Sequence, residues 1–376
     1  MKPDNAIAVQ PTSTFAREDR AMKQRLAKLK LAISVAMVFT MALSATAQRR
    51  GKDEVVVSSN YQNPEQLALK AWYPANQSAI VTLHAGASNQ VFLGSLSQPG
   101  TIVFDGSNVW VEHVASGGNF VDKLRASDNQ YLGSYYVGGS TAPSGFDGVN
   151  IIAPDHGNTG KVYFVRAADG NVASCSTGVA TLDSVAFDGQ YVWVSSNAGN
   201  VVKLSFNNAT RACNTVCTSA NQGSRLYDLV SDGNGYTWAT AIDTNQVIEF
   251  NGSCGVNSTV SAPGPVGIVF DGTYLWTAND TGSSISQISD NGAGGGSLVS
   301  TTNLNYSPWL IAYDGANIWT TGPTPGMVSK MSASNPTPTL TYYQACNSAS
   351  SFPLSLAFDG ANMWVGCEGV NQLGKM

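Results

Sequence analysis

Short apolar runs alternate with polar, glycine-containing turns along most of this chain. One stretch shows four such runs in order: WLIAY (309–313), NIWTT (317–321), MVSKM (327–331) and TLTYY (339–343). Short runs rich in aromatic and β-branched residues and bounded by turn residues indicate β-strands. The pattern therefore predicts an all-β protein built from groups of four short strands.

The four-strand group belongs to a repeat that occurs seven times. Its marker is an Asp-Gly pair, and the pairs begin at Asp105, Asp147, Asp188, Asp232, Asp271, Asp314 and Asp359, at intervals of 39 to 45 residues. Trp follows the Asp by five residues in five repeats; repeat two has Ile152 there, and repeat four has one additional residue before Trp238. A fixed period of this length with short strands is typical of β-propellers. We therefore predict a seven-bladed β-propeller of four-stranded blades over residues 79–376.

The Asp-Gly pair is expected to form the turn between the first two strands of each blade. Glycine adopts the positive φ angles that tight hairpin turns require, and Asp can accept hydrogen bonds from nearby backbone N–H groups. The flanking Phe and Trp are large enough to pack between neighbouring blades. Because a catalytic group is needed once and this motif recurs in every repeat, we interpret the motif as scaffold.

The last repeat ends one strand early. The chain stops at QLGKM (372–376), which matches the third strand of other repeats, VVKLS (201–205). We expect an N-terminal strand, either AIVTL (79–83) or QVFLGSL (90–96), to close the ring and remove two exposed sheet edges. Within the preceding segment, 48–78, Asn63 followed by Pro64 predicts the start of a short helix.

The first 47 residues have the character of a targeting segment. A basic stretch at 23–30 precedes thirteen uncharged residues at 31–43, and Ala45-Thr46-Ala47 fits a signal-peptidase site. We expect a signal peptide over 1–47, with Met22 as an alternative true start, and an uncleaved anchor as the competing interpretation. The expected location is periplasmic or extracellular, with no membrane span after cleavage.

Composition and charge fit an exported all-β protein. The chain is 43% hydrophobic and 12% charged, and the part from Gln48 on carries 13 Lys and Arg against 22 Asp and Glu, a net charge of 13 − 22 = −9. Such a surface argues against sequence-independent binding to nucleic acids, which depends on neutralising phosphates. We expect a monomer.

All six cysteines lie after the targeting segment, and an even number in an oxidising compartment predicts disulfides. Cys346 and Cys367 are expected to pair, because both fall at the same rim of the last blade. The other four cysteines come from consecutive blades and can pair across blades, in a connectivity that the sequence does not determine; they are Cys175, Cys213, Cys217 and Cys254. A zinc site would need close thiolate pairs, and CNTVC (213–217) is the one such spacing.

Three phrases resemble bacterial exported proteins with NHL-like propeller repeats, many of which are described as similar to streptogramin B lyases. They are ALKAWYPANQ (68–77), KLRASD (123–128) and AFDGANMWVG (357–366). The resemblance covers most of residues 62–376 and implies a seven-bladed propeller. For the lyases it further implies opening of a cyclic depsipeptide antibiotic by elimination, with a histidine base, glutamates and Mg²⁺.

Two histidines match the lyase pattern in part. His113 follows Glu112, and His156 follows Asp155 one repeat later, as in a family whose histidines lie about one repeat apart with acids nearby. A second glutamate has no residue-by-residue match, and no histidine follows His156. The resemblance therefore supports the fold more strongly than the lyase activity.

If the repeated motif is scaffold, function should lie where the repeats differ. One set of variable residues is expected at the turn between strands two and three, and another where the innermost strand begins; both lie at one mouth of the central channel. The candidates for a binding site are Glu112, His113, Asp155, His156, Asp183, Arg225, Tyr227, Trp309 and Glu368. Polar turns that only meet water are the competing interpretation.

The sequence thus favours an exported propeller that binds a ligand or protein at the channel mouth, without a cofactor. The partner would be a small molecule, a peptide or an envelope protein. One alternative is a lyase or hydrolase acting on a cyclic or ester-bearing molecule with Mg²⁺ or another divalent ion, and another is a purely structural envelope protein.

Overall fold

The computed structural model describes residues 98–115, 118–138, 142, 144–292, 294–334 and 338–376. The expected signal peptide, the short helix after Asn63 and both candidate closing strands lie outside the described residues. In the described part of the chain, no helix has the length and apolar character needed to span a membrane.

The strands form seven antiparallel sheets, each built from strands that are consecutive in sequence. Blade one has β1 (Pro99–Phe104), β2 (Asn108–Ala115), β3 (Gly118–Arg125) and β4 (Tyr131–Gly138); blade two has β5 (Gly145–Phe146), β6 (Asn150–Pro154), β7 (Lys161–Arg166) and β8 (Val172–Ser176); blade three has β9 (Leu182–Phe187), β10 (Val192–Ser196), β11 (Val201–Asn207) and β12 (Ala212–Thr218). Blade four has β13 (Leu226–Ser231), β14 (Thr237–Ala241), β15 (Gln246–Phe250) and β16 (Val256–Ser261); blade five has β17 (Pro265–Phe270), β18 (Tyr274–Asn279), β19 (Ser284–Asp290) and β20 (Gly296–Asn303). Blade six has β21 (Ile311–Tyr313), β22 (Asn317–Gly322), β23 (Met327–Ser332) and β24 (Thr341–Gln344); the 3₁₀ helix η3 (Ala345–Asn347) leads into blade seven, which has β25 (Pro353–Phe358), β26 (Met363–Cys367), the 3₁₀ helix η4 (Glu368–Val370) and β27 (Gln372–Lys375).

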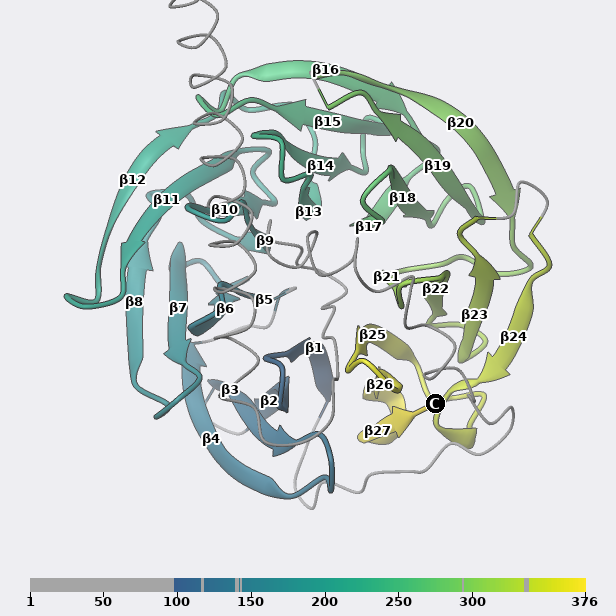
Figure 1. Cartoon of the computed structure of the whole chain (residues 1–376), viewed down its shortest axis with the longest axis horizontal. Helices are drawn as coiled ribbons and strands as arrows, with labels where there is room; N and C mark the ends of the chain where they lie inside the picture. Colours follow the sequence, from purple (N-terminus) through teal and green to yellow (C-terminus); the bar gives the residue numbers. More distant parts are fainter. Residues whose placement is uncertain (1–97, 116–117, 139–141, 143, 293, 335–337) are drawn as a thin grey trace, which may run out of the picture. The chain divides into compact units, whose positions relative to one another are not determined.

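The seven sheets stand around a common axis as the blades of a propeller (Figure 1). The first strand of each blade is the innermost, and the fourth strand of the first six blades lies at the outer rim. Blade seven has three strands among the described residues, and its inner strand contacts β1 of blade one. The prediction of a seven-bladed all-β propeller is confirmed.

The repeated Asp holds the first hairpin of each blade together. In blade five, Asp271 accepts hydrogen bonds from the backbone N–H groups of Thr273 (2.7 Å) and Tyr274 (2.8 Å), and its other carboxylate oxygen accepts one from Trp276 Nε1 (2.8 Å). The same Trp-to-Asp bond recurs in blades one, three, six and seven. The glycine after each Asp has a positive φ angle, 93° at Gly272, as the sequence predicts.

The aromatic residues of the motif fill the spaces between blades. Trp276 packs with Ile311 and Ile318 of blade six, and Trp364 packs with Ile102 and Phe104 of blade one across the point where the ring closes. The tryptophans of the motif are at most 3% exposed. Six blades thus bury the motif Trp against the next blade, and blade two buries Ile152 there, so the core consists of the packed interfaces between neighbouring sheets.

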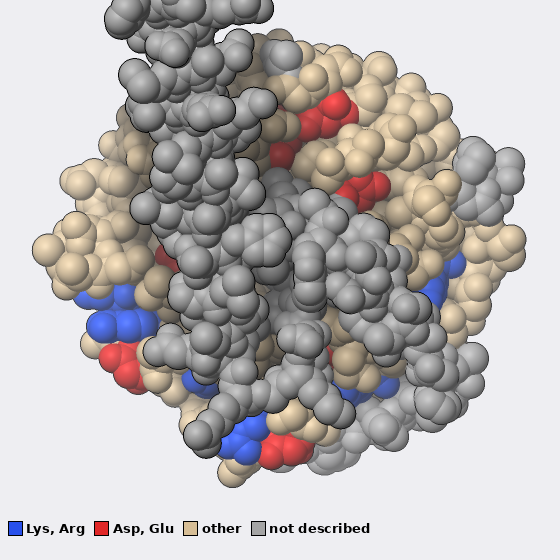
Figure 2. All heavy atoms as spheres, viewed as in Figure 1, with Lys and Arg blue, Asp and Glu red and all other residues tan. Residues whose placement is uncertain are grey.

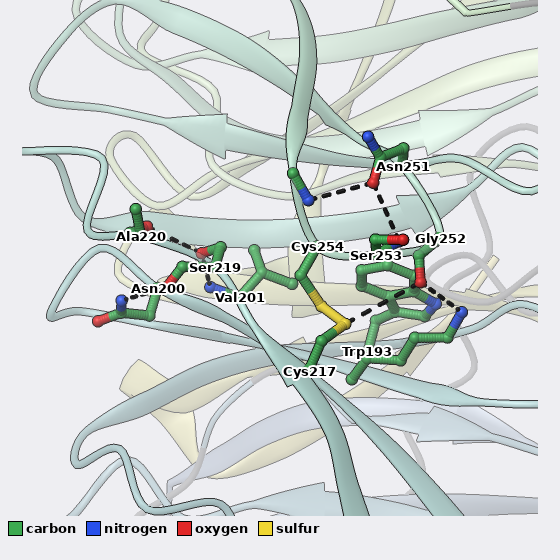
Figure 3. The surroundings of a disulfide bond; sticks show 12 residues. Trp193, Asn200, Val201, Cys217, Ser219, Ala220, Asn251, Gly252, Ser253 and Cys254 are labelled. Atoms are coloured by element: carbon green, nitrogen blue, oxygen red, sulfur yellow. Dashed lines mark hydrogen bonds between the residues drawn. A yellow bond between two sulfur atoms is a disulfide. The ribbon is translucent and has the colours of Figure 1, made fainter.

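Three disulfides link the described cysteines, and no described cysteine is free. Cys346 pairs with Cys367, as the sequence predicts, and ties the segment leading into blade seven to β26. The remaining two bonds cross between blades: Cys175–Cys213 joins blades two and three, and Cys217–Cys254 joins blades three and four. The second lies beside Trp193 (Figure 3).

Candidate functional site

An ion pair joins blades two and three near the inner strands. His156 lies in the turn between β6 and β7, and its Nδ1 is 2.8 Å from Oδ1 of Asp183, near the start of β9. The His156 side chain is 39% exposed and the Asp183 side chain 3%. The hydrogen bond to Asp183 raises the pKa of His156, whereas burial raises the pKa of Asp183 and its bond to His156 opposes that rise.

Asp183 has a second carboxylate oxygen that the pair does not use. Its Oδ2 is buried and has no hydrogen-bond partner among the described residues. The charge of Arg225 acts on this carboxylate and favours its ionised form. Arg225 is itself held by Asp243, with Nη2 to Oδ1 at 3.0 Å and a backbone bond to Oδ2 at 2.9 Å.

Two aromatic rings complete the group. Tyr227, the second residue of β13, and Trp309, just before β21, make an edge-to-face contact with ring centroids 5.3 Å apart. Both side chains are half-buried. Burial, with the nearby charge of Asp183, raises the pKa of Tyr227. We call His156, Asp183, Arg225, Tyr227 and Trp309 the inner-strand cluster, because four of the five lie where an inner strand begins.

The described surface carries few charges on one face of the protein. On the face seen in Figure 2, acidic and basic side chains of the described residues are few and scattered. The inner-strand cluster sets a buried carboxylate beside two half-buried aromatic rings. It combines one strong acceptor with flat apolar surface, the usual composition of a small ligand site.

Glu112 lies apart from the inner-strand cluster. Strand β2 continues to Ala115, so Glu112 is a strand residue and not part of the turn that the repeat alignment predicts. It faces blade two, where its carboxylate accepts hydrogen bonds from the Ser144 hydroxyl and the Ala142 backbone N–H (3.3 Å). Burial raises the pKa of Glu112 to about 8, which these hydrogen bonds only partly oppose.

His113 points to the opposite side of β2, because neighbouring strand residues alternate between faces. Its Nε2 lies 3.2 Å from Oδ1 of Asp122 without hydrogen-bond geometry, and its ring stacks on Phe120 at 5.9 Å. His113 is 6% exposed. The side chains of Glu112 and His113 therefore face opposite sides of blade one.

Asp155 and Glu368 do lie in turns, as predicted, but with local roles. Asp155 is fully buried and accepts bonds from the Gly157 backbone N–H (2.8 Å) and the Thr159 hydroxyl (2.5 Å), so it fixes its own turn. Glu368 begins η4 and lines a surface hollow with Gln98 and Asn371. Asp155 is close enough to Glu112 and to His156 for its charge to contribute to the raised pKa of each, after the larger effects of burial at Glu112 and of the Asp183 hydrogen bond at His156.

Two carboxylates near the inner-strand cluster were missed by the sequence analysis. Asp243 is the partner of Arg225. Asp228 is fully buried and accepts bonds from the Ser184 hydroxyl (2.7 Å) and the Ile268 backbone N–H (3.0 Å), so it joins the inner strands of blades three, four and five. An Asp directly after Tyr227, in an apolar inner strand, was the available signal.

The architecture is that of a seven-bladed β-propeller, and comparison with solved structures supports this. The chain is similar to virginiamycin B lyase from Staphylococcus aureus, at 18% identity and a TM-score of 0.62, over 77% of this chain and 98% of that one; the same values hold for a catalytically inactive variant of that lyase with quinupristin. It is also similar to the WD40 propeller domain of Doa1, at 14% identity and a TM-score of 0.60, over 77% and 97% of the two chains. No family model and no curated protein matches the sequence. At these identities, the likeness shows the fold.

The residues that the lyase resemblance points to do not fit a shared Mg²⁺ site. A divalent ion requires several oxygen ligands around one point. Glu112 and His113 face different seams, and Asp155 is occupied by its own turn. His156 alone among them joins the inner-strand cluster, where its imidazole is bonded to Asp183.

Proposed function

We propose that the protein is a binding module whose ligand occupies the inner-strand cluster. The observation that carries this proposal is Asp183 Oδ2, an acceptor in a side chain that is 3% exposed, without a hydrogen-bond partner among the described residues. Buried polar atoms are nearly always paired. A donor supplied by a ligand would therefore complete the cluster.

The neighbours of Asp183 indicate the class of ligand. Tyr227 and Trp309 offer aromatic surface at half-buried positions, and the faces of such rings attract cations. A ligand with an ammonium group on an aromatic or apolar body would donate to Asp183 and pack on the rings. Small amines and peptides both carry such groups, whereas an anion would meet the Asp183 carboxylate.

We further propose that this binding takes place outside the cytoplasm. Three disulfides in the described part of the chain suit an oxidising compartment. The basic and apolar stretches at 23–30 and 31–43 suit an export signal.

Tyramine, an ammonium on an aromatic body, is a suitable probe. It would be titrated into the protein while the imidazole NMR signals of His156 and His113 are followed. We expect shifts at His156 alone, with a Kd of about 1 mM or tighter, corresponding to about −4 kcal/mol. Asp183→Asn and Trp309→Ala should each weaken binding about tenfold or more. Asp128→Asn, an exposed change in blade one, is the matched control and should leave the Kd unchanged.

The absence of any shift at His156, or equal binding by the Asp183→Asn variant, would contradict the proposal. A folded propeller that binds no amine would fit a structural role instead. Circular dichroism spectra of each variant would confirm that a loss of binding is not a loss of fold.

A further inference from the structure

The third strand of most blades places a lysine over the repeated tryptophan. Lys Nζ lies 4.9, 4.7, 4.8 and 4.6 Å from the ring centroid of the Trp in blades one, three, six and seven. The lysines are cross-strand neighbours of these tryptophans, and they are Lys123, Lys203, Lys330 and Lys375. In blade three the ammonium also lies 3.7 Å from Oδ2 of the repeated Asp188. Four blades thus combine the repeated Asp and Trp with a lysine, which in blade three also pairs with the Asp.

Blade four replaces this cation with an anion. The cross-strand neighbour of Trp238 is Glu249, which is 0% exposed. Its Oε2 accepts hydrogen bonds from Asn257 Nδ2 (2.7 Å), Ser258 Oγ (2.9 Å) and the Gly295 backbone N–H (2.7 Å). Its other oxygen, Oε1, is buried without a hydrogen-bond partner among the described residues.

The additional residue in the first turn of blade four changes the repeated Asp as well. Asp232 is 1% exposed, and its Oδ1 accepts bonds from the backbone N–H groups of Asn234 (2.7 Å) and Tyr236 (3.2 Å). Its Oδ2, which in five other blades accepts the Trp N–H, has no hydrogen-bond partner among the described residues, and neither does Trp238 Nε1. Glu249 and Asp232 are therefore both buried carboxylates with one oxygen that lacks a hydrogen-bond partner among the described residues.

A third carboxylate comes from blade five. Asp290 ends β19, and its Oδ1 accepts a bond from the Gly292 backbone N–H at 3.0 Å. Oxygen atoms of Asp232, Glu249 and Asp290 all lie within 4.8 Å of one another. No cation pairs with any of the three in the described structure. Burial raises the pKa of Asp232 and of Asp290, and the charge of Glu249 adds to both rises. A hydrogen bond with Asp232 opposes the rise at Asp290. Burying like charges together is costly unless a cation joins them.

We propose that Asp232, Glu249 and Asp290 form a binding site for a hard divalent cation, Ca²⁺ in the first instance, between blades four and five. The metal would supply the positive charge that lysine supplies at this place in four other blades. Carboxylate oxygens are the ligands that Ca²⁺ prefers, and it accepts irregular geometry. Zinc prefers nitrogen and sulfur ligands, but every described cysteine is in a disulfide and the only described histidines lie in blades one and two.

Isothermal titration calorimetry of the full chain, disulfides intact and stripped with EDTA, would test this with CaCl₂. We expect one site per chain with a Kd of about 10⁻⁵ to 10⁻³ M and weaker binding of Mg²⁺, which demands octahedral geometry. Tb³⁺ as a Ca²⁺ substitute should show emission sensitised by Trp238, and Ca²⁺ should displace it.

Glu249→Lys is the decisive variant, because it restores the residue that blades one, three, six and seven carry at this position and should therefore fold. It should weaken Ca²⁺ binding by more than tenfold and abolish the Tb³⁺ signal; Glu249→Gln, which keeps a side-chain oxygen, should weaken binding in the same direction. Gln287→Glu is the matched control: it places an acid beside Trp276 in blade five and should leave the Kd unchanged.

The proposal would be overturned if the calorimeter detected no binding at about 10 mM Ca²⁺, a concentration above the Kd of the weakest extracellular calcium modules. Calcium binding that survives Glu249→Lys with the circular dichroism spectrum unchanged would also overturn it. Tighter binding of Mg²⁺ than of Ca²⁺ would refute the choice of metal.

Discussion

Two tryptophans of the repeat differ in one hydrogen bond, and this predicts different consequences when the indole N–H is removed. Trp276 donates from Nε1 to Asp271 at 2.8 Å, whereas Nε1 of Trp238 has no hydrogen-bond partner among the described residues. Both side chains are buried and pack against the following blade. Phe in place of Trp removes a similar volume from each, so this part of the destabilisation is common to both.

The difference between the two variants isolates the hydrogen bond. A hydrogen bond to a charged acceptor contributes about 1.5–3 kcal/mol to stability. Trp276→Phe removes the Nε1 donor, so the Asp271 carboxylate loses this hydrogen bond. At Trp238 the change removes a buried, unpaired N–H, which itself costs about 1–3 kcal/mol in the native state. We therefore expect Trp276→Phe to lower the free energy of unfolding by at least about 1.5 kcal/mol more than Trp238→Phe.

Guanidinium unfolding in EDTA, followed by far-UV circular dichroism, would measure both changes from the midpoint and the slope. Leu298→Ala, at a residue that is 48% exposed, is the control and should lie within about 0.5 kcal/mol of the unmodified protein. Equal losses for the two Phe variants would refute the role assigned to the Trp-to-Asp bond, and a larger loss at Trp238 would reverse it.

Three further predictions concern pH and the disulfides. Burial raises the pKa of Glu112 from 4.5 to about 8, so the stability that its protonated form contributes is fully present below pH 4.5 and is lost as pH rises to about 8. Glu112→Gln should make the melting temperature vary less with pH across this window. A pH profile of melting temperature that is the same in the variant would contradict the assignment. The hydrogen bond to Asp183 raises the pKa of His156 above 6.5, so an NMR titration of Asp183→Asn should show a lower His156 pKa, and no change would refute the pair. Replacing Cys217 and Cys254 by Ser should destabilise the protein by about 4 kcal/mol, from the loop-closure entropy of their 37-residue separation, in denaturant melts; a loss below about 1 kcal/mol would argue against an entropic role.

The fold was predictable because its signals are local. The Asp-Gly turn, the positive φ of its glycine and the Trp five residues later all lie within one hairpin, so they recur at fixed spacing in the sequence. The lysine that lies over the Trp in four blades is not visible as a fixed spacing in the sequence. It comes from the third strand, and the strands and turn before it vary in length. Lys123 therefore follows Trp110 by 13 residues, whereas Lys203 follows Trp193 by 10.

The candidate site was predictable only in part. The alignment placed Glu112 and His113 in a turn because it assumed equal strands, but β2 has eight residues and β6 has five. A longer strand turns adjacent polar residues toward opposite seams. Contact between Tyr227 and Trp309 spans two non-adjacent blades, so it depends on the curvature of the ring, which no local pattern encodes.

A crystal structure with tyramine would show directly whether Asp183, Tyr227 and Trp309 form the proposed ligand site. We expect the ammonium at about 2.7–3.2 Å from Asp183 Oδ2, with the ring of tyramine against Tyr227 or Trp309. Tyramine bound elsewhere, or Asp183 Oδ2 bonded to a protein donor with no ligand beside it, would contradict the claim.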